Sequence, residues 1–113
     1  MSYVCYELEE FEERSLNFYE KVSAKIADRM APIINPDFHM KYDAVIYWWL
    51  ELDPENVPVR EIGFDQNGDA IVVGPLGKNK GLFTHSQPKV QGFYPVEMYQ
   101  FVEQWEAFKG IHK

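Results

Sequence analysis

Side chains that could bind a metal are few in this sequence and widely spaced. The three histidines are His39, His85 and His112, and the lone cysteine is Cys5. Transition metals need several such ligands close together, with characteristic short spacings between them. No such spacing occurs here, so the sequence predicts no metal site and no other cofactor. A site assembled in space from His39, Asp37 and His85 is the alternative that the spacing leaves open.

Two glycine-containing stretches have some features of ligand-binding loops. DQNGD at residues 65–69 begins like a calcium loop, but its glycine comes one position too early and the closing glutamate is absent. GPLGKNKG at residues 74–81 is rich in glycine and lysine, but Asn79 stands where a phosphate-binding loop has Ser or Thr. We interpret the first stretch as a hairpin turn and the second as a surface loop.

Candidate nucleophiles lack the surroundings that would activate them. Cys5 has several carboxylates close in sequence, and negative charge nearby disfavours the reactive thiolate. No serine lies in a GxSxG frame. The sequence therefore predicts a protein that is not an enzyme.

Composition and charge limit the class of protein further. The chain has 113 residues, 46% of them hydrophobic, which suits one domain over residues 1–113. Its 18 acidic and 11 basic side chains give a net charge of −7, and direct nucleic-acid binding is disfavoured because phosphates need Lys and Arg. A single cysteine allows no internal disulfide, and no apolar run approaches the roughly 20 residues of a membrane span. We expect a cytoplasmic protein without membrane contacts.

Helical periodicity is strongest at the two ends of the chain. From Leu8 to Met30, apolar side chains recur three or four positions apart, with acidic residues early and basic residues late, as the helix dipole favours. Residues 3–6 either belong to this helix or form a short extended lead-in. Pro95 suits the first position of a helix over residues 96–109. The predicted apolar stripe of that helix comprises Met98, Val102, Trp105 and Phe108.

Three strands are predicted between these helices, at residues 44–52, 57–64 and 70–73. DPEN separates the first two, and Asn-Gly within DQNGD favours a two-residue type I′ turn before the third. LFTHS at residues 82–86 is a candidate for a short fourth strand. The predicted fold is α+β, an antiparallel three- to four-stranded meander flanked by an N-terminal and a C-terminal amphipathic helix.

The first predicted strand carries two adjacent tryptophans, which alternation places on opposite faces. The even-numbered face is entirely apolar, so Trp48 is predicted to lie in the core. The odd-numbered face changes from apolar to charged, so Trp49 either packs beneath a helix of this chain or lies at an exposed binding surface.

The register of the sheet decides which residues join each tryptophan. A two-residue loop at residues 67–68 would pair Phe64 with Ile71. A plain four-residue turn at residues 53–56 would place Phe64 on the face of Trp49, whereas a one-residue bulge would place it with Trp48. The sequence leaves both registers open.

An acidic stretch surrounds the aromatic strand. Residues 51–69 contain six acidic side chains and one basic side chain, Arg60. Acidic surfaces attract cationic partners mainly by speeding association, and exposed aromatic side chains anchor interfaces. The predicted partner-binding residues are Tyr47, Trp49, Glu51, Asp53, Glu55, Glu61, Asp65 and Asp69.

The chain resembles the small acidic immunity proteins of bacterial contact-dependent and polymorphic toxin systems. The features that carry the resemblance are YWWLELD running into PVREIGFDQNGDAIVVGP, the compact α+β length, the acidic balance and the lack of a catalytic motif. Such proteins bind a cognate toxin domain, often a basic nuclease, and block its active site. The resemblance implies a protein-binding module that neutralises a toxin by occlusion.

Two other functions remain open. The first is a small-molecule-binding protein or enzyme with a cleft between the sheet and the loop at residues 74–81. A deep pocket containing both His39 and His85 would favour it. The second is a homodimer that buries the odd-numbered strand face against its own copy.

Overall fold

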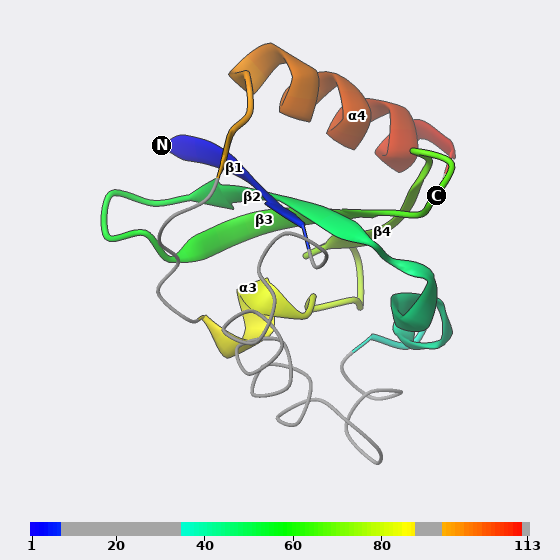
Figure 1. Cartoon of the computed structure of the whole chain (residues 1–113). Helices are drawn as coiled ribbons and strands as arrows, with labels where there is room; N and C mark the ends of the chain where they lie inside the picture. The colour runs from blue at the N-terminus through cyan, green and yellow to red at the C-terminus, as the bar shows by residue number, and fades with distance from the viewer. Residues whose placement is uncertain (8–34, 88–93, 112–113) are drawn as a thin grey trace.

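The computed structural model describes residues 1–7, 35–87 and 94–111 and shows an α+β fold (Figure 1). Its sheet has five antiparallel strands, and α4 is the one helix of seven or more residues in the described part of the chain. The predicted N-terminal helix at residues 8–30 lies outside the described residues. The elements in chain order are β1 (Ser2–Glu7), the 3-10 helix η2 (His39–Ala44), β2 (Tyr47–Leu52), β3 (Pro58–Phe64), β4 (Ala70–Gly74), α3 (Phe83–Ser86), β5 (Tyr94–Pro95) and α4 (Met98–Ile111).

The predicted meander is extended by two strands. The sheet order is β4-β3-β2-β1-β5, so β1 lies inside the sheet and residues 3–6 are a strand rather than part of a helix. Residues 82–86 do not form the possible fourth strand but carry the short helix α3. The backbone N–H groups of Leu82 and Thr84 donate to the carboxylate of Glu61, which holds this segment in a turn instead of a ladder.

The sheet is covered on both faces, by α4 on one side and by α3 on the other (Figure 1). On the α3 face, the ring of Phe83 meets those of Tyr6 and Trp48 with centroids 5.8 and 5.1 Å away. Trp48 is fully buried, which confirms its predicted place in the core. On the α4 face, Phe101 meets Tyr3 at 5.2 Å.

Two hairpin turns of the same design connect β2 to β3 and β3 to β4. In the first, Asn56 N–H donates to Asp53 C=O and Asn56 has φ 65°. In the second, Gly68 N–H donates to Asp65 C=O and Gly68 has φ 80°. Each loop has three residues and ends in the left-handed region, so the predicted type I′ turn is wrong. Consequently Phe64 pairs with Ala70 and not with Ile71.

The register between β2 and β3 places Phe64 on the face of Trp49. Tyr47 pairs with Phe64, and Trp49 pairs with Ile62. A plain four-residue turn would pair Asp53 with Asn56 and leave two residues in the loop, whereas Asp53 pairs with Val57 and the loop has three. A bulge beside Glu51 adds a second extra residue. Because two extra residues leave the alternation of faces unchanged, Phe64 lies on the face of Trp49, as predicted for the plain turn.

Helix α4 uses a different inner face from the predicted one. It begins at Met98, after Pro95 has paired in β5. Phe101 and Trp105 are buried, whereas Met98 is 60% exposed and Val102 is 37% exposed. The prediction is therefore wrong for Met98 and Val102, because apolar residues occur on more than one side of this helix and the contact of Phe101 with the sheet selects which side turns inward.

Candidate functional site

The eight predicted partner-binding residues do not form one surface. Asp53 and Glu55 lie in the turn before β3, and Asp65 and Asp69 lie in the turn after it. Strand β3 has seven residues, so at roughly 3.3 Å per residue the two turns are on the order of 20 Å apart. The acidic charge is thus divided between opposite ends of the sheet.

Two of these turn acids have a structural use. One carboxylate oxygen of Asp53 accepts the backbone N–H groups of Glu55 and Val57 at 2.8 and 3.0 Å. In the other turn, one carboxylate oxygen of Asp65 accepts two N–H groups in the same way, at 2.9 and 3.0 Å. Side-chain acceptors of this kind stabilise the turns themselves.

Glu61 is buried on the α3 face, so its predicted place on the partner-binding surface is wrong. It is 1% exposed. Its Oε2 accepts the N–H of Leu82 at 2.9 Å, and its Oε1 accepts the N–H and hydroxyl of Thr84 at 2.9 and 3.2 Å. Burial raises the pKa of this carboxyl, while the three hydrogen bonds act in the opposite direction. Glu61 therefore anchors the segment that leads into α3.

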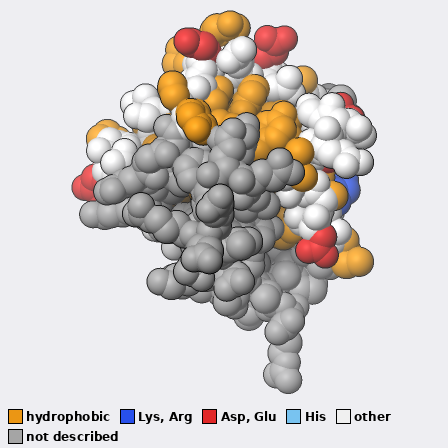
Figure 2. Space-filling model, viewed as in Figure 1, with side chains coloured by type: hydrophobic (Ala, Val, Ile, Leu, Met, Phe, Trp, Pro, Cys, Tyr) orange, Lys and Arg blue, Asp and Glu red, His pale blue; other side chains and the backbone are white. Residues whose placement is uncertain are grey.

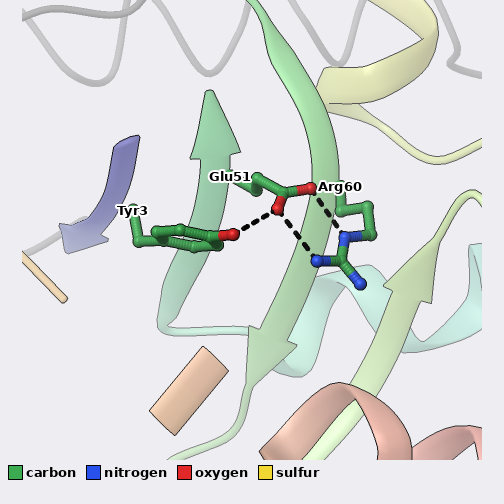
Figure 3. Close-up of polar contacts among 3 residues, drawn as sticks. All are labelled: Tyr3, Glu51 and Arg60. Atoms are coloured by element: carbon green, nitrogen blue, oxygen red, sulfur yellow. Dashed lines mark hydrogen bonds and ion pairs between the residues drawn. The ribbon is translucent and has the colours of Figure 1, made fainter. Parts of the chain in front are cut away.

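Glu51 is also buried, on the α4 face, within a cluster of three polar side chains (Figure 3). Arg60 donates to it twice, from Nε to Oε1 at 2.6 Å and from Nη2 to Oε2 at 2.8 Å. The hydroxyl of Tyr3 donates to Oε2 at 2.6 Å. Tyr3, Glu51 and Arg60 are direct cross-strand neighbours on β1, β2 and β3. We call these three residues the polar row.

The polar row has the electrostatics of a structural ion pair. The hydrogen bonds from Arg60 hold the pKa of Glu51 below its usual value, and those same bonds raise the pKa of Arg60. The hydrogen bond that Tyr3 donates to Glu51 raises the pKa of the Tyr3 hydroxyl. All three groups are therefore held in their ordinary charge states near neutral pH, which suits them to positioning and not to proton transfer.

Trp49 packs against this chain's own side chains. The ring centroid of Trp49 lies 4.6 Å from that of Phe64. The ring of Tyr47 stacks on the same Phe64 ring, with centroids 4.7 Å apart. Both residues are half-buried beside the core. Tyr47 also approaches the second turn, since a Cβ built at Gly68 would lie 3.8 Å from its hydroxyl. Tyr47, Trp49, Asp65 and Asp69 thus share one end of the sheet.

More than half of the exposed large apolar side chains gather at the start of α4 and in β5. Seven large hydrophobic residues are exposed in the described part of the chain, and four of them fall within residues 94–102. Exposed acidic side chains follow on the same helix, and Figure 2 shows hydrophobic and acidic groups side by side over α4. We define the helix surface as Tyr94, Met98, Tyr99 and Val102 together with Glu97, Glu103 and Glu106.

Two pockets flank the loop at residues 74–81. The larger, of about 660 Å³, is lined by Asp37, Leu76, Gly77, Asn79, Glu106, Lys109 and Gly110. The smaller, of about 420 Å³, is lined by Pro58, Val59, Pro75, Lys80, Thr84, His85 and Gln87. The side chain of His39 and all of His112 lie outside the described residues, so the predicted pairing of two histidines stays open.

Residues 1–7, 35–87 and 94–111 contain no group of three or more His, Cys, Asp or Glu side chains that would hold a metal ion. Within these same ranges, no helix is both long enough and apolar enough to cross a membrane.

Sequence reasoning missed the helix surface because it assigned Met98 and Val102 to the buried stripe. The signal available in the sequence was the excess of apolar positions on this helix, which include Tyr99 and Phe101 as well. No family model, curated protein or solved structure matches the chain.

Proposed function

We propose that this protein is a cytoplasmic protein-binding module that binds a basic partner through the helix surface. The observation that carries the proposal is the concentration of exposed apolar side chains in residues 94–102. Tyr99 is 65% exposed, and Met98 and Tyr94 are 60% and 56% exposed. Contiguous exposed apolar groups rimmed by polar ones are typical of protein interfaces, where aromatic side chains and methionine are enriched.

Charge indicates which kind of partner fits. The helix surface carries three exposed glutamates, and the whole chain has a net charge of −7. A symmetric dimer through this surface would bring acidic rim against acidic rim, which costs free energy. A partner with Lys and Arg around an apolar centre is complementary. A basic toxin domain neutralised by occlusion of its active site is the partner that we propose.

Capture experiments with matched variants test this proposal. The bait is the full chain, compared with the double variant Met98→Ser/Tyr99→Ser and with the control Met40→Ser. Met40 is the most exposed of these hydrophobic residues, at 81%, but lies in η2. We expect a basic protein that binds the wild type and the control but is lost, by at least about tenfold in affinity, with the double variant.

Binding measurements with the purified protein and its captured partner test the proposal quantitatively. Calorimetry with the captured protein at two salt concentrations should show affinity falling as salt rises, because charged rims are screened. A partner that binds the double variant as tightly as the wild type, or a partner without excess basic charge, would refute the proposal.

A second candidate function is small-molecule binding at the pocket of about 660 Å³. Its volume falls in the range of ligand sites, and three of its lining residues belong to the predicted loop at residues 74–81. Leu76→Arg should fill this pocket. A small molecule that stabilises the wild type against heat but not this variant would favour the second function over the first.

The group of Tyr47, Trp49, Asp65 and Asp69, predicted from the sequence to bind the partner, has at most a minor part in the proposed contact, because Tyr47 and Trp49 pack on Phe64. Solution mass measurement separates all of these proposals from a homodimer.

A further inference from the structure

Helix α4 is joined to the sheet by aromatic side chains that converge on one arginine. The guanidinium of Arg60 lies 5.2 Å from the ring centroid of Phe101 and 5.0 Å from that of Trp105. These two rings are nearly parallel, with centroids 6.3 Å apart. The guanidinium of Arg60 thus lies over two rings of the helix.

The edge of the same guanidinium is bound by the sheet. Its Nε and Nη2 donate to the two oxygens of Glu51, and Tyr3 donates to one of those oxygens from the opposite side (Figure 3). The ring of Tyr3 in turn contacts Phe101. A planar guanidinium can bind a carboxylate with its edge and stack on rings with its face, whereas a lysine ammonium can do neither in this way.

We infer that Glu51 and Arg60 are positioning residues that fix α4, and with it the helix surface, on the sheet. Arg60 is the single side chain in contact with both Phe101 and Trp105 among the cation contacts of the described residues. Glu51 sets the plane of its guanidinium, and Tyr3 sets the orientation of Glu51. The consequence for partner binding rests on the proposed function, but the positioning itself concerns the free protein.

The geometry explains why a buried charge is kept in this layer. Glu51 is 8% exposed at its side chain and Arg60 is 28% exposed, so each is largely removed from water. An apolar contact is less directional than a bidentate ion pair, so apolar packing alone would define the rotation of α4 on the sheet less narrowly. A bidentate ion pair that also lies 5.2 and 5.0 Å from two rings of the helix narrows the rotation, because the position of Arg60 relative to Glu51 and to both rings is set at once.

Hydrogen exchange of backbone amides on the free, full-length protein tests the inference. The variants are Arg60→Lys, Glu51→Gln and the milder Tyr3→Phe, and the matched control is Glu55→Gln, which removes an exposed carboxylate from the first turn. We expect exchange in residues 102–111 to accelerate about tenfold more than exchange in β2 and β3 in Arg60→Lys and Glu51→Gln, because any loss of global stability accelerates all three elements alike. Tyr3→Phe should have a smaller effect of the same kind, and Glu55→Gln should have none.

The contrary results are distinct. Equal acceleration in β2, β3 and α4 would show that these residues support only global stability, and unchanged exchange in α4 would show that the helix is held by its apolar contacts. Either result overturns the inference, and Tyr3→Phe keeps the test available if a stronger variant does not fold. Since no partner is used, loss of the proposed function in the capture experiment would leave this result unaffected.

Discussion

Arg60 and Glu51 form a bidentate pair on adjacent strands, with Nε to Oε1 at 2.6 Å and Nη2 to Oε2 at 2.8 Å. Each is the direct cross-strand neighbour of the other. The pair lies between the sheet and α4, so its charge state influences how firmly the helix is held. This relationship makes the stability of the protein depend on pH in a defined direction.

The first prediction concerns the stability of the protein at acidic pH. The pKa of Glu51 in the folded protein lies below its usual value of 4.5, chiefly because Arg60 donates to it. A carboxyl whose pKa is lower in the folded than in the unfolded protein stabilises the fold at any pH above its unfolded-state pKa. This contribution is lost as pH falls through the folded-state pKa. At pH 7, Glu51→Gln should lower the free energy of unfolding by about 2 kcal/mol. This is less than the cost of breaking a fully buried ion pair, because the side chain of Arg60 is partly exposed to water.

Urea unfolding of the wild type and Glu51→Gln at pH 7 and at pH 3 measures this prediction. The difference between the two proteins should shrink as pH falls, since protonated Glu51 no longer differs in charge from glutamine. A difference that stays constant over this range would contradict the assignment.

The second prediction is that Glu61 shows the opposite pH dependence. Burial raises its pKa above the usual 4.5, so the associated stability is fully present below 4.5 and declines as pH rises through the folded pKa. The stability of the wild type relative to Glu61→Gln should therefore fall as pH rises above 4.5, whereas the stability of the wild type relative to Glu51→Gln should rise with pH below 4.5 and be level above it.

Glu61→Ala adds a test that does not depend on titration. It leaves the buried N–H of Leu82 without its acceptor and removes two hydrogen bonds from Thr84, which should cost about 2 kcal/mol. Urea unfolding at pH 7 gives the value, and a cost near zero would show that the segment leading into α3 is held by other contacts.

The contrast between these two glutamates shows what sequence alone can predict. Alternation correctly separates Trp48 from Trp49, because successive side chains of a strand lie on opposite faces. It left open which tryptophan shares a face with Phe64, and the register of β2 with β3 places Phe64 with Trp49. The same alternation puts Glu51 and Glu61 on opposite faces of the sheet. It does not reveal that both are buried, since their donors come from Arg60 and from residues 82–84, which only the folded chain brings near.

The order of strands in the sheet and the inward face of α4 could not be predicted from the sequence either. Residues 3–6 fit either the predicted helix or an extended segment in the sequence. The place of β1 between β2 and β5 depends on pairing with segments about 45 and 90 positions away. Helix α4 was predicted to within two residues at its ends, but its inward face depends on Arg60 and Tyr3 in the sheet. Local periodicity contains no information about those partners.

The third prediction concerns the two turns. Asp53→Ala and Asp65→Ala each remove an acceptor for two backbone N–H groups and should each cost about 1 kcal/mol. Because the turns lie at opposite ends of β3, the double variant should show the sum of the two costs within about 0.5 kcal/mol. Chemical denaturation of the three variants measures this additivity, and a large departure from the sum would mean that the two hairpins form as one coupled unit.

The fourth prediction concerns Trp49, which the sequence left between core and interface. Its ring lies 4.6 Å from Phe64, on a face where Ile62 and Phe64 are buried. Trp49→Ala should therefore lower the free energy of unfolding by about 2 to 3 kcal/mol, less than for a fully buried tryptophan because the ring is half-buried. Binding of the captured partner, measured where the variant is fully folded, should change by less than about threefold, whereas Met98→Ser/Tyr99→Ser should weaken it strongly with little loss of stability. The reverse pattern, with Trp49→Ala stable and deficient in binding, would return the interface to the strand face and remove it from α4.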